Sequence, residues 1–221
     1  MAVIYDTLRP ELERVKTELE RLAGMVITVG VQAKGGTGAG GASVGGASGD
    51  LLKIAGVHEY GCTITAKGKY LAIPLRKECV GVSPRSFSDT FVVESDGAAF
   101  ICRAKKGRKN LSDAKNLIFL YVLKHSVVIP ERSYIRASFD TGKAKIDKAA
   151  REAVEMIILE GADAMKAAEY VGMAARDMTV QYFSKIAPPK GALQARLSGW
   201  STPLVVTGRL RNSITYRVEG G

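Results

Sequence analysis

The side chains best suited to chemistry in this chain of 221 residues lie around a histidine–glutamate pair. His58 and Glu59 begin like the pattern H-E-x-x-H, in which two histidines one helical turn apart bind zinc. Cys62 occupies the position of the second histidine, so the sequence does not predict this site. A cysteine nucleophile paired with His58 or His125 stays open, but nothing around the cysteines marks an activated thiolate. We expect structural or surface roles for both histidines, and no enzymatic activity.

The three cysteines are odd in number and form no C-x-x-C pair; they are Cys62, Cys79 and Cys102. With only two histidines, they cannot complete a common Cys/His zinc site at plausible spacing. We predict reduced thiols, buried for structural reasons, and no bound metal.

A glycine pattern typical of dinucleotide-binding proteins, G-x-G-x-x-G, occurs at residues 36–41. Dinucleotide binding requires a helix directly behind these glycines, so that its N-terminal amides meet the pyrophosphate. Here eight more small residues follow before any helical pattern, and no second βαβ unit is evident. We interpret residues 33–49 as a flexible glycine-rich loop and expect no cofactor.

The formal net charge of +10 is concentrated at residues 103–109 (RAKKGRK), and again at Arg209, Arg211 and Arg217. Such clusters attract phosphate backbones without sequence specificity. The simpler interpretation of 103–109 is a solvated hairpin tip, because Gly107 lies inside the cluster and little aromatic surface accompanies it. Both interpretations stay open.

Neither a membrane span nor a signal peptide is expected. The longest uninterrupted apolar run, residues 117–123, is far shorter than the roughly 20 residues that a spanning helix needs. Asp6, Arg9, Glu11 and Glu13 interrupt the N-terminal segment, unlike the apolar centre of a signal peptide. We expect a soluble protein that is not exported by a Sec-type route.

The periodicity of the apolar residues predicts which elements position these groups. An apolar stripe predicts a helix over 4–23, lying on a sheet or forming a short coiled-coil seam; its residues are Leu8, Leu12, Val15, Leu19 and Leu22. Strands are predicted at 25–32, 69–75, 90–93, 98–103 and within 116–129, with a tight turn around residues 95–97. Asp50 should cap a short helix that ends near Gly61.

From Thr141 onward the apolar period is helical. One helix face is predicted from Ile146, Ala150, Val154, Ile157 and Ile158. Gly161 should break this helix, and Asp163 should cap a second one that runs to about Ile186, with small residues on its inner face. The predicted fold class is α+β, with a mixed or antiparallel sheet packed by the N-terminal helix and this helical pair. We expect a single domain over 1–221, with the loop at 33–49 and a β-rich insertion at about 63–128.

Three short segments place glycine, proline or arginine at the ends of predicted elements. They are residues 57–61 (VHEYG), 129–136 (IPERSYIR) and 203–214 (PLVVTGRLRNSI). In the first, Val57 and Tyr60 should pack inward, and Gly61 should let the chain turn into the next strand.

The second and third segments each carry two arginines. The second leaves a strand at Pro130, and its Arg132 and Arg136 lie where guanidinium groups can clamp carboxylates or backbone carbonyls. In the third, Thr207 should cap one helical turn, whose Leu210 and the following Ile214 face the core while its arginines point outward.

In this order the three segments resemble the bacteriophage tail-completion and virion-morphogenesis family, whose members help join head and tail. The family pattern runs (I/V)HE(Y/F)G, then IP-x-R-P-(F/Y)-(L/I)-R, and ends with PL-x-D-T-G-R-L-x-x-S-I. This chain has Ser133 where proline is usual and Val206 where aspartate is usual. The resemblance covers most of the chain outside the glycine-rich loop.

The resemblance implies a structural protein of the phage neck that closes into a ring, expected to be a hexamer. Its partners would be its own copies and other neck, tail-terminator, tail-tube or head-completion proteins, with non-specific contact to passing DNA as an option. It would assemble in the host cytoplasm and stay in the virion. The candidate subunit-contact residues are His58, Glu59, Tyr60, Gly61, Pro130, Arg132, Arg136, Thr207, Gly208, Arg209 and Arg211.

Two further expectations follow. The last strand, near the C-terminus, should be a sheet edge or be completed by a neighbouring subunit. The alternative function is a basic nucleic-acid-binding module that uses the cluster at 103–109.

Overall fold

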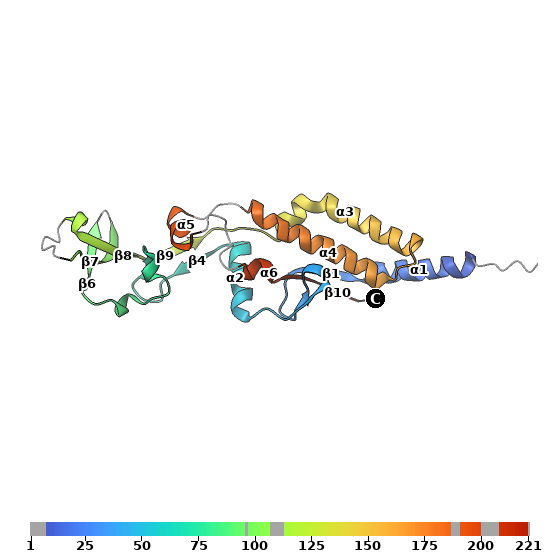
Figure 1. Ribbon diagram of the computed structural model, residues 1–221, viewed down its shortest axis with the longest axis horizontal. Helices are drawn as coiled ribbons and strands as arrows, with labels where there is room; N and C mark the ends of the chain where they lie inside the picture. Colours follow the sequence, from blue (N-terminus) through green and yellow to red (C-terminus); the bar gives the residue numbers. More distant parts are fainter. Residues whose placement is uncertain (1–7, 96, 107–112, 187–190, 200–207, 221) are drawn as a thin grey trace, which may run out of the picture. The chain divides into compact units, whose positions relative to one another are not determined.

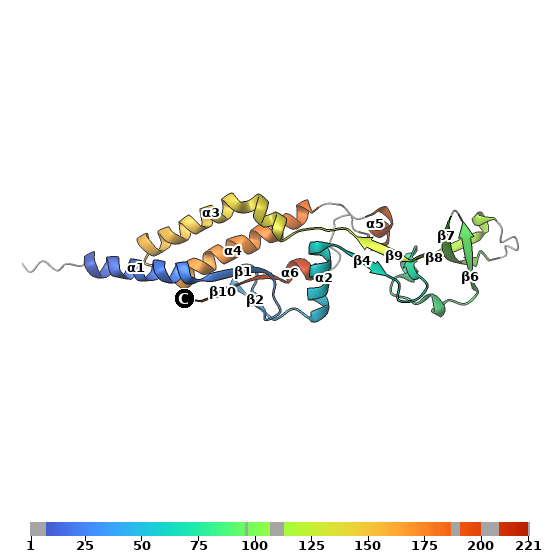
Figure 2. The same cartoon turned by 180° about the vertical axis from the view of Figure 1, so that it is seen from behind.

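The chain combines helices with antiparallel sheets, which confirms the predicted α+β fold class (Figures 1 and 2). The computed structural model describes residues 8–95, 97–106, 113–186, 191–199 and 208–220. Backbone contacts divide the chain into two compact units. Unit 1 comprises residues 1–59, 132–187 and 207–221, and unit 2 comprises 60–131 and 188–206. The sequence predicts one domain with a β-rich insertion at about 63–128. Unit 2 contains this insertion together with a later segment, residues 188–206.

Unit 1 contains the long helices and one four-stranded sheet. Its elements are α1 (Leu8–Gly24), β1 (Val26–Val31), β2 (Gly36–Thr37), β3 (Ser43–Val44), α2 (Gly49–Tyr60, of which Tyr60 belongs to unit 2), α3 (Arg136–Leu159), α4 (Ala164–Tyr182), α6 (Arg209–Asn212) and β10 (Ile214–Glu219). Short 3-10 turns lie at Ala39–Gly41 and Phe183–Lys185.

The sheet of unit 1 has the order β1-β10-β2-β3, so β10 is an inner strand. Its residues pair antiparallel with β1 from Val26 opposite Glu219 to Val31 opposite Ile214, and Tyr216 also pairs with Thr37 of β2. The prediction that the last strand is an edge was therefore wrong. Its second neighbour comes from the glycine-rich loop, where no strand was expected. A side chain at Gly36 would lie 2.6 Å from the Tyr216 carbonyl, so glycine allows this approach.

Helix α4 packs on this sheet and α3 packs on α4, both through small residues. In α4 the predicted inner face is buried, and Gly172 lies against the ring of Tyr216. In α3 the buried face includes Ala149, Ala153 and the predicted Ile157, whereas the predicted Ala150 and Ile158 are exposed and Val154 is half-buried. The helix also begins five residues earlier than predicted, at Arg136. Asp163 caps α4 as predicted, accepting the N–H of Lys166 at 2.7 Å.

Helix α1 covers the outer end of the helical pair with only part of its apolar stripe. Val15, Leu19 and Leu22 pack on the buried residues of α3 and α4. Leu8 and Leu12 remain 67% and 58% exposed. The two halves of one predicted stripe therefore have different surroundings.

Unit 2 is a β-rich body around a small core. Its elements are β4 (Cys62–Thr65), β5 (Leu71–Pro74), β6 (Thr90–Ser95), β7 (Ala98–Ala104), β8 (Leu117–Lys124), β9 (Ser126–Ile129) and α5 (Ala192–Ser198), with 3-10 turns at Lys77–Cys79, Pro84–Ser86 and Ala114–Asn116. One sheet has the order β5-β8-β7-β6, and β4 pairs with β9 in a two-stranded ribbon. The predicted hairpin of β6 and β7 is confirmed. Cys79, Leu120 and Tyr121 form the buried centre, and the Tyr121 hydroxyl donates to the Val82 carbonyl at 2.8 Å.

Candidate functional site

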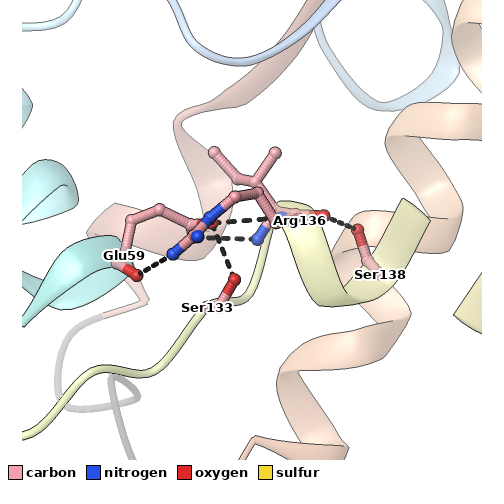
Figure 3. A network of polar contacts seen from close by, with 5 residues as sticks. Glu59, Ser133, Arg136 and Ser138 are labelled. Atoms are coloured by element: carbon pink, nitrogen blue, oxygen red, sulfur yellow. Dashed lines mark hydrogen bonds and ion pairs between the residues drawn. The ribbon is translucent and has the colours of Figure 1, made fainter. Parts of the chain in front are cut away.

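The Glu59 carboxylate is the centre of a polar network in unit 1 (Figure 3). Its Oε1 accepts hydrogen bonds from the Ser133 hydroxyl at 3.0 Å, the Arg136 backbone N–H at 3.1 Å and the Arg136 Nε at 3.2 Å. Its Oε2 accepts the backbone N–H of Ile135 at 3.0 Å. Arg136 Nη2 also donates to the Glu59 carbonyl at 3.0 Å. Arg136 thus clamps both a carboxylate and a carbonyl, as predicted.

The network exists because helix α3 begins there. The first N–H groups of a helix have no partner within the helix, and the helix dipole favours a negative charge beside them. Ile135, at the cap position, has no polar side chain to serve them. Glu59, at the end of α2, supplies the missing acceptor from 76 residues away in the sequence. The Ser138 hydroxyl then donates to the Ile135 carbonyl at 2.7 Å and contacts the Thr179 hydroxyl of α4 at 3.0 Å.

Electrostatics keeps the Glu59 carboxylate ionised. Burial raises the pKa of Glu59, but the N–H groups of Ile135 and Arg136, the Ser133 hydroxyl and the Arg136 guanidinium together outweigh burial. The pKa of Glu59 is therefore below its ordinary value. A buried carboxylate with this many donors is anchored, so we assign it to holding α2 against the start of α3.

His58 and Arg132 form a second contact beside this network. The Arg132 backbone N–H donates to the His58 carbonyl at 2.8 Å, and Arg132 is only 7% exposed. Burial and then the Arg132 charge lower the pKa of His58, and burial also lowers the pKa of Arg132. The buried Nδ1 of His58 has no hydrogen-bond partner within the described part of the chain.

Residues 60–61 and 129–131 of the first two segments lie in unit 2. Gly61 has a φ of +69°, and a side chain there would lie 2.8 Å from the Glu131 nitrogen, so its turning role is confirmed. Strand β9 ends at Ile129, directly before Pro130, also as predicted. Tyr60 is 68% exposed, so the prediction that it packs inward was wrong. Tyr60 is the last residue of α2 and directly follows the buried Glu59, so its side chain points away from the side of the helix on which Glu59 is buried.

The third segment forms the short helix α6 and the start of β10. Leu210 and Ile214 are buried, and Arg209 and Arg211 are exposed, as predicted. Gly208, with a φ of 72°, occupies the cap position of α6 that the sequence assigns to Thr207, and Thr207 itself lies outside the described residues. The candidate residues therefore do not form one cluster of exposed groups: Glu59 and Arg132 are buried, and Arg136 is bound to Glu59.

The groups considered for metal binding do not come together. Among the described residues, no three His, Cys, Asp or Glu side chains are close enough to hold a metal ion. Cys79 and Cys102 are buried, Cys62 is half-buried, and all three are free thiols. Burial raises the pKa of the Cys79 and Cys102 thiols. In the basic cluster, residues 107–109 lie outside the described residues, while Arg103, Lys105 and Lys106 are exposed.

Sequence reasoning missed Ser133 and the N–H groups of Ile135 and Arg136 as the partners of Glu59. The available signal was Glu59 itself. A glutamate is rarely buried unless donors surround it, so burying this residue would have required partners. Because the helix was predicted to begin at Thr141, the backbone donors near residue 135 were not recognised as helix-terminal groups.

No protein-family model, curated protein or solved structure matches this chain. Of the helices that the structure describes, none is long and apolar enough to cross a membrane.

Proposed function

We propose that this chain is a structural protein of a bacteriophage virion, which completes the tail or joins it to the head as part of a ring. The observation that carries the proposal is the Glu59 network. It joins two of the three segments on which the family resemblance rests, one through Glu59 and the other through Ser133 and Arg136.

This coupling matters because unrelated sequence matches need not meet in space. Glu59 and Ile135 are 76 residues apart in the sequence, yet the carboxylate of the first segment binds the backbone of the second. The third segment contributes Leu210 and Ile214 to the buried part of the same unit. All three segments therefore contribute to the folding of unit 1, which is the role that a structural protein needs from its most characteristic residues.

A neighbouring subunit would cover the exposed apolar residues at one end of unit 1. In both views the N-terminal half of α1 extends past the turn between α3 and α4 (Figures 1 and 2). The elements that meet at this end carry large exposed apolar side chains: Leu8 and Leu12 in the first turns of α1, Ile158 and Leu159 at the end of α3, and Met165 at the start of α4. Clustered apolar surface of this kind is typical of protein–protein contacts. Leu8 and Leu12 also continue the stripe whose other half already packs on helices.

The proposed assembly is a head-to-tail ring, because repeated heterologous contacts close at a fixed rotation. Six copies are expected from the family resemblance. The ring would contact other neck, tail-terminator, tail-tube or head-completion proteins and would form in the host cytoplasm before incorporation into the virion.

Light scattering on the purified full chain over a concentration series tests the proposal. We expect a species of six times the 23.6 kDa chain mass that grows at the expense of monomer. The double variant Leu8→Ser/Leu12→Ser should shift the series toward monomer. Val92→Ser, a change at a 58% exposed valine of unit 2, is the matched control and should assemble like the natural chain. A strict monomer at every concentration, also with purified tails present, would overturn the proposal.

A further inference from the structure

The positive charge of this protein belongs almost entirely to unit 2. Unit 1 has 18 basic and 16 acidic residues, a net charge of +2. Unit 2 is smaller but has 14 basic and 6 acidic residues, a net charge of +8. Because the charge is divided so unevenly, unit 2 has a positive electrostatic field that attracts anions, whereas the net field of unit 1 is weak.

Within unit 2, basic side chains surround a hollow of about 530 Å³. Its lining includes the half-buried Phe119 and Leu75, here called the floor, and the exposed Arg76, Lys77 and Arg196, here called the rim. Arg196 donates to the Leu75 carbonyl at 3.2 Å, which attaches α5 to the end of β5. The hollow thus combines three cations at its rim with an apolar floor, on which the bases or sugars of a nucleic acid can pack.

Further cations of unit 2 lie on and beside the neighbouring strands. Arg103 of β7 pairs in register with Ile118, so its side chain alternates to the sheet face opposite Leu117 and Phe119, and it does not line the hollow. Lys105 donates through Nζ to the Lys115 carbonyl, which holds both exposed lysines at the same end of the sheet. Glu78 is the acidic residue of the hollow, and it is paired with Arg76 at 3.4 Å. A hydrogen bond within its own residue, the Arg76 side chain and the Arg103 charge lower the pKa of Glu78.

We infer that this hollow binds the phosphate backbone of nucleic acid without sequence specificity. DNA carries about one negative charge per 1.7 Å of duplex, and each phosphate contact releases counterions. Single strands commonly bind in a basic groove whose apolar floor stacks with bases. The site differs from the hairpin tip at 103–109, because its centre is the rim of Arg76, Lys77 and Arg196. The inference rests on the charge distribution of unit 2 and does not require the ring.

An anionic lipid surface is less well matched. Binding to a lipid surface usually uses an amphipathic helix or a flat basic face with apolar side chains that insert. Here the cations surround a concave hollow, which suits a linear polyanion. Vesicles containing phosphatidylserine therefore enter the test as the competing outcome.

Fluorescence anisotropy with labelled single-stranded and duplex DNA of mixed sequence, titrated with the full chain over a salt series, tests the inference. We expect binding that weakens steeply with salt. The variant Arg76→Ser/Lys77→Ser, which removes two cations of the hollow and none of the cluster at 103–109, should reduce the salt slope by about two and weaken binding about tenfold at moderate salt. The control Lys143→Ser/Lys145→Ser removes the same charge from exposed residues of unit 1 and should bind like the natural chain.

A second measurement needs no variant. Chemical acetylation of lysines, followed by mass spectrometry, should show Lys77 protected by DNA and Lys143 unprotected. Equal losses in the two variants, protection of Lys143 instead, or binding to the vesicles but not to DNA would each overturn the inference. DNA binding by a strict monomer would uphold the inference and contradict the proposed ring, so the two conclusions fail separately.

Discussion

Units 1 and 2 use the same kinds of residue for different purposes. In unit 1, Gly142 and Gly172 are buried in helices because a side chain would collide with Met178 or Tyr216. In unit 2, Gly68, Gly81 and Gly97 lie in turns where a side chain would meet nothing within 4 Å. At these positions glycine permits close helix packing in unit 1 and chain reversal in unit 2.

Acidic residues differ in the same way. In unit 1, two glutamates far from the helices they serve accept N–H groups at helix N-termini: Glu59 at α3, and Glu18 at α4, where Oε2 accepts the Ala164 N–H at 2.7 Å. In unit 2, Glu78 forms an exposed pair with a residue two positions away. Unit 1 therefore depends on long-range electrostatic contacts, whereas unit 2 leaves most of its charge facing solvent.

The largest expected effect distinguishes these two glutamates. Glu59→Gln should lower the free energy of unfolding by about 3 kcal/mol, because the buried donors and the Arg136 guanidinium lose their anion. Glu78→Gln is the matched control and should leave the unfolding midpoint unchanged, since an exposed pair contributes little. Chemical denaturation followed by circular dichroism at helix wavelengths measures both variants. Equal effects would remove the proposed difference between the units.

The next effect tests helix packing within unit 1. Gly172→Ala should destabilise the protein by about 2 kcal/mol, because the new methyl group overlaps the Tyr216 ring. Gly56→Ala, in α2 where nothing lies within 4 Å, should instead stabilise it by up to about 1 kcal/mol through helix propensity. Thermal unfolding of the two variants gives the signs directly. A stabilising Gly172→Ala would show that the helix and sheet separate easily there.

Two buried tyrosines give a smaller contrast. Tyr121→Phe in unit 2 should cost about 1 kcal/mol, because its hydroxyl donates to the Val82 carbonyl. Tyr134→Phe in unit 1 should be neutral or slightly stabilising, since its buried hydroxyl has no hydrogen-bond partner among the residues described. The denaturant midpoints of the two variants, compared with that of the natural chain, measure both effects. A large loss in Tyr134→Phe would reveal a partner of that hydroxyl.

The smallest effect is a pH dependence of unit 1. The folded-state pKa of His58 is below its ordinary value, so the unfolded chain takes up this proton first. Stability should therefore fall as pH drops below about 6.5, and the fall should be smaller in His58→Gln. The pKa of Glu59 is also lowered, so a second loss should begin near pH 4.3 and be smaller in Glu59→Gln, where other carboxyls with lowered pKa remain. Unfolding free energies measured from pH 7 to 3 separate the two windows.

Much of the local structure could be predicted from the sequence. Alternation identified β1 and the hairpin of β6 and β7, and the aspartate at position 163 identified the start of α4. The arginine clamp at position 136 was also predictable, because a guanidinium at an element boundary usually finds an oxygen. These features depend on residues that are close in sequence or on a single well-defined side-chain preference.

By itself, then, the sequence determined the fold class, most helices and strands and the turn at Gly61. Only the tertiary structure decided that β10 lies inside its sheet, that part of the glycine-rich loop pairs with it, and that Glu59 serves helix α3. The physical reason is the same in each case. A backbone N–H or C=O is satisfied by whichever group the fold brings near, and that choice is made between residues far apart in the chain.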